Sequence, residues 1–301
     1  KEENVFPCPK CDVALTYHRF DESLRCHYCG ANYKMPKTCP SCGREYIKYT
    51  GIGTQQVEEQ LKLVFPNVRC LRMDMDTTSG KTAHRDILDA FTRREADVLI
   101  GTQMVAKGLD IPNVTLVGVV FADSTLFHSD FRSSERTFQL LTQVAGRAGR
   151  ADKEGRVVIQ TNAPGHRAIR LCTKHDYKTF YNLEIGDRLR TLFPPFAVFV
   201  RAQFACADEN AAADAAERFA NGVTKTILTA LKPANAENEL VFALAGAAPI
   251  RRREGLFRYA VIIKLVRTAN TAAAINAIYA FSDGCADECY RGIEVNPQDM
   301  L

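Results

Sequence analysis

Six cysteines near the start of the chain are spaced for metal binding. They form three Cys-x-x-Cys pairs: Cys8 with Cys11, Cys26 with Cys29, and Cys39 with Cys42. Two residues between the cysteines let both thiolates of a pair face one ion, and two pairs complete a tetrahedral zinc site. Because four thiolates leave no coordination position open, we expect the zinc to be structural. Six thiolates make one complete site and half of a second.

Two other interpretations of these cysteines stay open. The pairs could form disulfides or a thioredoxin-like redox centre, although no βαβ pattern surrounds them. His18 and His27 could serve as alternative zinc ligands, although the cysteines suffice. The five remaining cysteines are expected to be small buried side chains.

A second group of residues could contact phosphates. Gly101 and Thr102 follow a short apolar stretch and lead to Lys107, Gly108 and Asp110. A glycine and a threonine at the end of a strand offer backbone and hydroxyl donors to DNA phosphates, while Lys107 and Gly108 allow close approach of the backbone. Asp110 could hold a ribose or a pair of arginines. A strand-end turn without any ligand is the alternative.

Residues 139–150, which read QLLTQVAGRAGR, carry two arginines separated by two residues. Hydrolysis of a γ-phosphate develops negative charge, and two such guanidinium groups can approach one triphosphate from a single loop or helix edge. We expect Arg150 to be an arginine finger and Arg147 to be its companion on the phosphates. Gln143 would position the nucleotide or couple two lobes. The alternative is a surface helix with solvated arginines.

The elements that must position these residues alternate between helix and strand from residue 51 to about 163. We expect helices at 55–64, 85–93 and 135–145, and strands at 69–73, 98–101, 114–122 and 155–161. Strands that are nearly all apolar and separated by helices are typical of a parallel sheet covered on both faces. Gly101 and Thr102 then lie at the carboxyl end of a strand, where ligand sites of such sheets are found.

A different pattern follows residue 163. One or two helices are expected over 164–193, and Pro194 and Pro195 end them. Beyond them we expect strand 198–205, helix 210–231, strand 240–244, strand 257–266, helix 271–282 and strand 291–295. The order βαββαβ is typical of a ferredoxin-like fold. The sequence thus predicts four parts: a zinc module (1–50), an α/β lobe (51–163), a helical linker (164–196) and a C-terminal α+β domain (197–301).

Four arginines surround Glu254 between two predicted strands of the last domain: Arg251, Arg252, Arg253 and Arg258. A hairpin with four arginines could follow a phosphate backbone or receive an acidic peptide, but it could also be merely solvated. The aromatic neighbours of Arg258, Phe257 and Tyr259, could stack on bases or face the core.

The composition is that of an ordinary soluble globular chain. It has 301 residues, of which 46% are hydrophobic and 25% charged, enough for two or three domains. The net charge of +4 is too small to indicate nucleic-acid binding by itself, so local clusters must support it. We find neither an apolar run long enough to span a membrane nor a signal peptide, and cysteines of the metal-binding type favour a cytoplasmic location.

Together these motifs resemble the C-terminal part of the bacterial primosomal protein N′ (PriA) family of superfamily 2 helicases. The segments GTQMVAKG at 101–108 and QVAGRAGR at 143–150 resemble the fifth and sixth helicase motifs, which belong to the second of two RecA-like lobes. The paired cysteines, the stretch GIGTQQVE at 51–58 and the stretch FRSSER at 131–136 match the same family. The resemblance runs over nearly the whole chain.

The resemblance implies a fold, an activity and partners. It implies a RecA-like second lobe in an ATP-dependent, Mg²⁺-using 3′ to 5′ DNA helicase for replication restart and primosome assembly at stalled forks. Forked and single-stranded DNA, the single-stranded DNA-binding protein and other primosome proteins are the implied partners. The P-loop lobe would precede this chain, so we expect the fragment alone to be inactive.

The family arrangement also assigns the cysteines. Cys8, Cys11, Cys26 and Cys29 would form the complete zinc site, and Cys39 and Cys42 would be half of a second site whose other pair lies upstream. One alternative is a non-catalytic zinc-ribbon module for binding DNA or protein on a degenerate helicase lobe. The presence of Lys107, Arg147 and Arg150 disfavours it. Another is a different motor with the same lobe, such as a branch-migration helicase or a restriction translocase.

Overall fold

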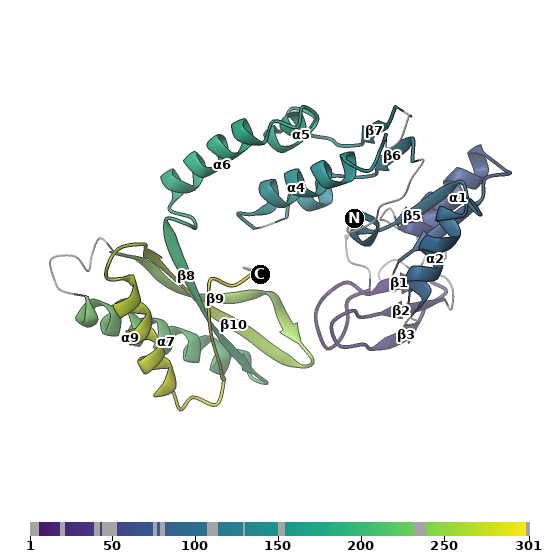
Figure 1. Ribbon diagram of the computed structural model, residues 1–301. Coiled ribbons are helices and arrows are strands. Elements are labelled where there is room, and N and C mark those ends of the chain that lie inside the picture. Colours follow the sequence, from purple (N-terminus) through teal and green to yellow (C-terminus); the bar gives the residue numbers. More distant parts are fainter. Residues whose placement is uncertain are drawn as a thin grey trace. The chain divides into compact units, whose positions relative to one another are not determined.

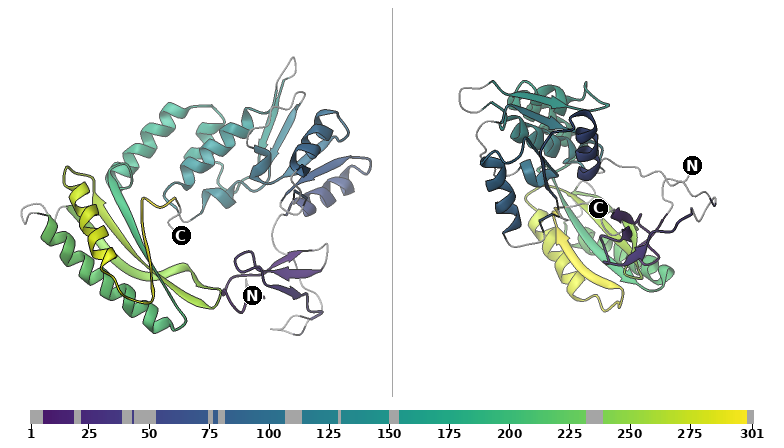
Figure 2. Two further views of the ribbon diagram at one scale, coloured as in Figure 1. Left: turned by 60° about the horizontal axis from the view of Figure 1, so that its bottom comes forward. Right: turned by 90° about the vertical axis from the view of Figure 1, so that its right-hand side faces the viewer.

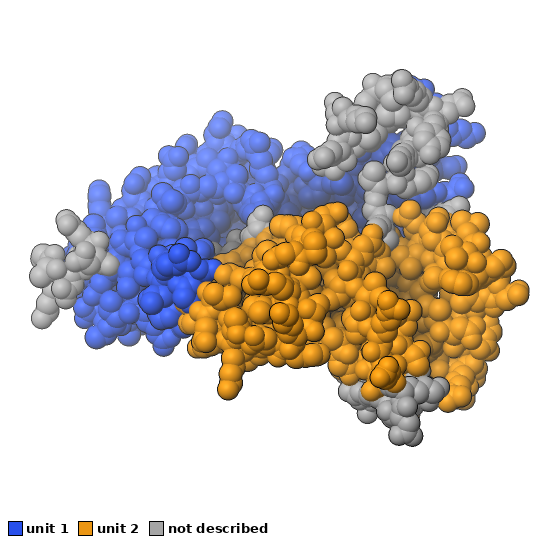
Figure 3. All heavy atoms as spheres, turned by 90° about the horizontal axis from the view of Figure 1, so that it is seen from above, with its two compact units in different colours: residues 1–48, 186–301 blue, residues 49–185 orange. Residues whose placement is uncertain are grey.

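The chain folds into two compact units. The computed structural model describes residues 6–18, 22–38, 43, 53–74, 77–78, 82–106, 114–128, 130–149, 154–231 and 239–298. One unit joins residues 1–48 to residues 186–301, and the other comprises residues 49–185 (Figure 3). The cysteine-rich segment therefore folds with the C-terminal domain, although residues 49–185 separate the two in sequence. Within the described residues, no helix is both long enough and apolar enough to cross a membrane.

The cysteine-rich segment contains a small antiparallel sheet. Its strands are β1 (Thr16–His18), β2 (Ser23–Arg25) and β3 (Asn32–Lys34), in the order β1-β2-β3 (Figure 1). The buried apolar side chains among the described residues here are Leu24 and three of the cysteines, and Val13, Leu15 and Ala31 are partly buried around the cysteines. Such a small apolar core cannot stabilise three-residue strands by itself, so the fold depends on what the cysteines bind.

The second unit alternates helices and strands as the sequence predicts. Its elements are α1 (Thr54–Val64), β4 (Cys70–Met73), α2 (Ala83–Thr92), β5 (Val98–Gly101), the 3₁₀ turn η1 (Gln103–Ala106), β6 (Leu116–Val119), α3 (Asp123–Leu126), α4 (Ser133–Ala145) and β7 (Arg156–Ile159). The predicted strand 114–122 is shorter in the structure, because the chain turns into α3 directly after it.

The strands of this unit pair in parallel, but they do not form the single covered sheet that the sequence predicts. Strand β4 pairs with β5, and β6 pairs with β7, so the described residues form two separate two-stranded sheets. Residues of β6 and β7 alternate between half-buried and exposed, and Leu116 and Val158 are exposed. The apolar run of β6 predicts burial on both faces, but within the described part of the chain only one face of this strand is covered.

Two helices follow as expected, α5 (Arg167–Cys172) and α6 (Tyr177–Thr191). Helices α4, α5 and α6 contribute to one apolar core, in which the rings of Phe138 and Phe180 stack with centroids 4.2 Å apart. The first turns of the predicted linker are thus part of the second unit, and the boundary between the units falls inside α6.

The C-terminal domain is a four-stranded antiparallel sheet with two helices on one face (Figures 1 and 2). Its elements are β8 (Ala197–Cys206), α7 (Glu209–Ala230), β9 (Leu240–Arg253), β10 (Leu256–Val266), α9 (Thr271–Asp283) and β11 (Tyr290–Val295). The sheet order is β11-β8-β10-β9, and the order of elements is the predicted βαββαβ. Val200, Ala202 and Phe204 alternate along β8 and meet Phe219 and Val223 of α7 in the core.

The hairpin between β9 and β10 differs from the prediction. Strand β9 continues to Arg253, so Arg251, Arg252 and Arg253 lie in the strand rather than in a loop. Only Glu254 and Gly255 form the turn, with φ angles of 54° and 87°, and Arg253 pairs with Leu256 across it. Positive φ at both central residues is typical of the tight type I′ turn, whose twist matches that of paired strands.

Candidate functional site

Four cysteine side chains converge in the cysteine-rich segment. The ligand atoms of Cys8, Cys11, Cys26 and Cys29 all lie within 4.8 Å of one another, and the first three residues are at most 1% exposed. A zinc–sulfur bond of about 2.3 Å with tetrahedral angles places ligand sulfurs about 3.8 Å apart. The Sγ atoms of Cys8 and Cys29 are 3.7 Å apart. The cluster therefore fits a tetrahedral zinc ion.

Each Cys-x-x-Cys pair lies on a tight turn built by backbone hydrogen bonds. The N–H groups of Cys11 and Asp12 donate to the carbonyl of Cys8, and the N–H of Gly30 donates to the carbonyl of Cys26. The residue after each pair, Asp12 or Gly30, has a positive φ of 50° or 70°. These two turns, which we call the first and second knuckles, use the same left-handed residue to turn both thiols toward one point.

The surroundings of the cluster shift the pKa values of Cys11 and Cys26 in opposite directions. Burial raises the pKa of the Cys11 thiol to about 12. Burial opposes ionisation of Cys26 as well, but hydrogen bonds from the backbone N–H groups of Cys29 and Tyr28 outweigh it and lower the pKa of Cys26 to about 7. A bound zinc ion would favour the thiolate form of its cysteine ligands.

The structure can be compared with the other interpretations of the cysteines and with the alternative ligands. The four clustered cysteines are free thiols, which does not support the disulfide interpretation. The rings of His18 and His27 pack against each other at 5.4 Å, and neither belongs to the cluster. Cys39 and Cys42 lie outside the described residues.

In the second unit, Gly101 and Thr102 lie at the carboxyl end of β5, as predicted. Gly101 pairs with Met73 at the end of β4. A Cβ atom on Gly101 would lie 2.6 Å from the carbonyl oxygen of Met73 and 2.1 Å from a side-chain carbon of Val105, so only glycine fits between the strand end and η1. Lys107, Gly108 and Asp110 lie outside the described residues.

Asp74 at the same strand edge was not among the predicted site residues. It follows β4 and is 8% exposed, and its carboxylate accepts hydrogen bonds from the Thr54 hydroxyl (2.6 Å) and the Thr77 N–H (3.0 Å). Burial alone would raise its pKa, but these hydrogen bonds and Arg72, at 3.2 Å, hold the pKa below its usual value. The ionised Asp74 fastens the start of α1 to the edge that carries Gly101. Its sequence signal is an aspartate and two threonines just after an apolar strand.

Asp123 has the matching place in the second strand pair. It begins α3 after β6, is 5% exposed, and accepts hydrogen bonds from the Thr161 hydroxyl (3.1 Å) and the Asn162 N–H (3.1 Å) just beyond β7. In this pair a buried carboxylate thus ties together the carboxyl ends of both strands, whereas Asp74 links the end of β4 to the start of α1.

Helix α4, which carries Gln143, lies beside the segment that follows β5. Helix α4 packs against η1, so the segment after Thr102 and the helix that carries Gln143 are neighbours. Gln143 is exposed, and Arg147 is half-buried in the turn that follows the helix. Gly149 has a φ of 76°, and its N–H donates to the carbonyl of Val114 before β6. Arg150 lies outside the described residues.

Three of the four hairpin arginines already have partners within the unit. Arg251 pairs with Glu209 at the start of α7, Arg252 donates to the carbonyl of Pro9 (3.3 Å), and Arg253 contacts the Glu254 carboxylate (3.3 Å). Tyr259 also donates to Glu209, and Phe257 lies under the Arg252 guanidinium at 5.1 Å. These two aromatic residues therefore support the hairpin rather than present free rings.

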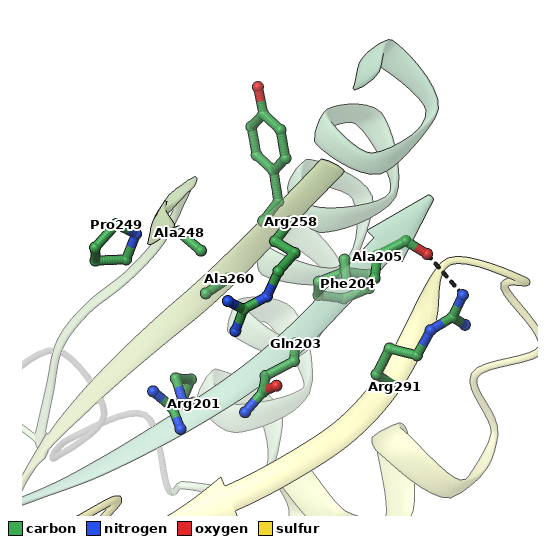
Figure 4. A pocket seen from close by; sticks show the side chains of 10 residues that line it. Arg201, Gln203, Phe204, Ala205, Ala248, Pro249, Arg258, Ala260 and Arg291 are labelled. Atoms are coloured by element: carbon green, nitrogen blue, oxygen red, sulfur yellow. Dashed lines mark hydrogen bonds between the residues drawn. The ribbon is translucent and has the colours of Figure 1, made fainter. Parts of the chain in front are cut away.

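Arg258 differs from the other three. It lines a small pocket on the sheet face opposite the helices, where Figure 4 shows its guanidinium turned toward Gln203 and Arg201. Arg201 pairs with Glu294 at 2.9 Å, and Arg291 donates to the carbonyl of Ala205 at 2.7 Å.

Within the described residues, the side chain of Arg258 has no hydrogen-bond or ion-pair partner. Burial, together with the like charges of Arg253 and Arg201, lowers the pKa of Arg258. An anion in this pocket would offset that repulsion.

Comparison with known proteins identifies the family. A family profile described as the PriA DNA helicase Cys-rich region (CRR) domain matches residues 8–34, and the helicase conserved C-terminal domain profile matches residues 46–152. The replication restart protein PriA of Bacillus subtilis (strain 168) is 46% identical over 271 residues, which cover 90% of this chain and 32% of that protein. The chain belongs to the PriA family.

Other members of the PriA family extend the match. The replication restart protein PriA of Synechocystis sp. is 49% identical over 65% of this chain and 24% of that protein, and that of Treponema pallidum is 39% identical over 76% and 34%. The chain thus spans about a third or less of the length of the relatives it matches, and corresponds to their C-terminal portion.

Among solved structures, the C-terminal domain of the DEAD-box protein Dbp5 aligns with 47% of this chain and 78% of its own at 17% identity. The TM-score of 0.28 is too low to define the fold.

Proposed function

We propose that this chain supplies the second helicase lobe, the zinc module and the C-terminal domain of an ATP-dependent 3′ to 5′ DNA helicase. The parent protein would act in replication restart and primosome assembly at stalled forks. The observation that carries the proposal is the joint presence of a PriA-type cysteine-rich region and a helicase C-terminal domain in a chain 46% identical to a replication restart protein over 90% of its length.

The lobe would contribute one side of the ATP site. Arg150 would stabilise charge on the transferred phosphoryl group, with Arg147 beside it and Gln143 positioning the nucleotide or coupling the two lobes. The first lobe, which this chain does not contain, would bring the phosphate-binding loop and Mg²⁺. The support for this assignment is that the helix carrying Gln143 packs beside the segment that follows Gly101 and Thr102.

The same edge would contact DNA. The backbone of Gly101, the hydroxyl of Thr102 and the side chain of Lys107 are suited to hydrogen-bond phosphates, Gly108 would admit the strand, and Asp110 would hold the ribose or the arginines. Asp74 supports this role indirectly, since its hydrogen bonds fix the end of β4, which pairs with the end of β5 that carries Gly101.

The zinc module and the C-terminal domain would serve recognition. The zinc site of four cysteines would be joined by a second site, to which Cys39 and Cys42 contribute half, and the module would bind other primosome proteins. We infer a ferredoxin-like fold for the C-terminal domain, because its sheet order β11-β8-β10-β9 and its two helices on one face agree with that fold. Its open face would bind DNA through Arg258, with Arg252 and Arg253 nearby, and the domain would receive the single-stranded DNA-binding protein.

The remaining assignments follow from this activity. A replication restart helicase works in the cytoplasm, where the thiols of the zinc module stay reduced. The functional division would be residues 1–50, 51–163, 164–196 and 197–301, with the first and last parts folding as one unit.

The ATPase rate of the full-length protein, measured with and without forked DNA beside this chain alone, tests the proposal. We expect DNA-stimulated turnover in the full-length protein and none in this chain. Absence of turnover in both would instead support a non-catalytic zinc-ribbon binding module. Turnover stimulated equally by duplex and forked DNA would favour a different motor.

A further inference from the structure

The tip of the β9–β10 hairpin lies on the first knuckle (Figure 2). The backbone N–H of Glu254 donates to the Sγ atom of Cys11 at 3.4 Å, and the N–H of Gly255 donates to the carbonyl of Lys10 at 2.9 Å. Arg252 adds a hydrogen bond to the carbonyl of Pro9 at 3.3 Å. Three consecutive residues of the knuckle thus each accept one hydrogen bond from the hairpin.

The turn conformation explains why these two N–H groups are available. In a two-residue hairpin turn, the N–H groups of the central residues do not take part in the strand ladder. Every backbone N–H group is a hydrogen-bond donor, and those of Glu254 and Gly255 find their acceptors on the knuckle. The φ angles of 54° and 87° that place them there leave little room for a β-branched residue at position 255.

One residue from each strand of the hairpin bonds to α7, and these bonds hold the hairpin in place where it contacts the knuckle. Arg251 of β9 and Tyr259 of β10 both bond to Glu209, the first residue of α7. A continuous path of hydrogen bonds and paired strands thus runs from the start of α7 to a zinc ligand. Along the described chain, the sulfurs of the second knuckle receive no such donor from the hairpin; Cys26 is served by N–H groups of its own turn.

We propose that the β9–β10 hairpin tip is an outer shell of the zinc site, so that zinc occupancy and docking of the arginine-bearing hairpin stabilise each other. The N–H of Glu254 stabilises the Cys11 thiolate, and the N–H of Gly255 fixes the knuckle backbone. Groups that orient metal ligands in this way are typically worth about 10- to 100-fold in metal affinity. By linkage, zinc favours the docked hairpin by the same factor.

The proposal implies that zinc binding in the zinc module is coupled to the position of the hairpin in the C-terminal domain. Arg253 and Arg258 lie on the two strands of this hairpin, next to the tip that contacts the knuckle. Their positions would therefore depend on whether zinc is bound. The inference requires zinc binding only, and it does not depend on helicase activity.

Hydrogen exchange of the zinc-loaded chain and of the chain stripped by a chelator tests the coupling without any substitution. We expect the amides of Glu254 and Gly255 to exchange at least about tenfold faster after zinc removal, in line with the linked affinity. Amides in the middle of α7 and α9 should exchange at unchanged rates. Equal exchange at the hairpin tip in both forms would overturn the proposal.

A set of variants tests the reverse direction. Gly255→Val opens the turn and should make zinc transfer to a chromogenic chelator about 10- to 100-fold faster, with a changed thiolate-to-metal absorption band when Co²⁺ replaces zinc. Gly246→Val is the matched control in β9, because a Cβ there meets nothing within 4 Å. Glu254→Asn keeps a residue that tolerates positive φ and removes only the carboxylate.

Both control variants should retain zinc as the unmodified chain does. Wild-type zinc release from Gly255→Val would contradict the proposal, and so would rapid release from Glu254→Asn, since the backbone N–H of Glu254 and not its carboxylate contacts Cys11. If Gly255→Val disturbs the sheet, seen as faster exchange in α7, the exchange experiment on the unmodified chain still decides.

Discussion

The zinc centre and the strand edge of the lobe are built in opposite ways. All four ligands of the zinc centre come from residues 8–29 and lie within 4.8 Å of one another, and three of them are at most 1% exposed. At the strand edge, buried aspartates fasten the framework, whereas Gln143 and Thr102 are exposed. The four zinc ligands thus come from one short segment, whereas the ATP site proposed above would need a second lobe to complete it.

The largest effect expected from breaking the zinc centre is loss of the whole module. Replacing one ligand, Cys26→Ser, removes a buried thiolate from a site whose metal supplies the folding free energy, about 10–16 kcal/mol for comparable structural zinc. We expect loss of tightly bound zinc by elemental analysis, and loss of amide protection in β1–β3 with the lobe unchanged. Cys70→Ser in β4 is the control and should retain zinc. Two equally tight ions in the unmodified chain would show that Cys39 and Cys42 hold a metal too.

In the lobe, Arg150→Ala should lower the rate of ATP hydrolysis without unfolding the protein. In the full-length protein we expect ATP turnover to fall by about 10³- to 10⁵-fold, as for other arginine fingers, with DNA binding nearly unchanged. The control is Arg156→Ala, an exposed arginine on β7. Equal turnover in the Arg150 variant and the unmodified enzyme would remove the assignment, whereas lost DNA binding would indicate a DNA contact instead.

The framework of the strand edge can be tested separately from its chemistry. Gly101→Ala forces a Cβ to within 2.6 Å of the Met73 carbonyl, and overpacking of this kind costs about 1–3 kcal/mol. Gly118→Ala in β6 is the matched control, because a Cβ there meets nothing within 4 Å. We expect faster hydrogen exchange of β4 and β5 in the first variant only. Equal protection in both would show that the edge tolerates a side chain at 101.

Local sequence patterns were enough to predict most elements and the metal cluster. The helix predicted at 210–231 is α7 at Glu209–Ala230, and the Cys-x-x-Cys spacing identified the four clustered cysteines. Both signals act over a few residues, through helical periodicity and through the geometry of one turn. Strand β9 was predicted too short, since Gly246, Pro249 and the arginines are poor strand formers. Pairing with β10 overrides that preference at the sheet edge, where proline is tolerated.

Contacts between distant segments were beyond sequence analysis. Arg252, which is predicted to bind DNA, also donates a hydrogen bond to the carbonyl of Pro9, 243 positions away, and the sequence carries no sign of that contact. Lys264 would be expected at the surface, yet it is 8% exposed and donates to the carbonyl of Thr191 beside the ring of Phe193. No local pattern carries such information, because the partner is chosen by tertiary packing.

The smallest expected effect separates Arg258 from the arginines that hold the hairpin. Its half-buried guanidinium has no partner along the described chain, and burial and like charges lower its pKa, so Arg258→Ala should leave the stability of the domain unchanged. If Arg258 binds a DNA phosphate, the variant should bind single-stranded DNA more weakly for every sequence, and the slope of log affinity against log salt should shrink by about one. Arg218→Ala on α7, whose side chain pairs with Asp287, is the control and should keep the original slope. An unchanged slope with Arg258→Ala would exclude a phosphate contact, whereas a loss of stability would show that Arg258 supports the sheet instead.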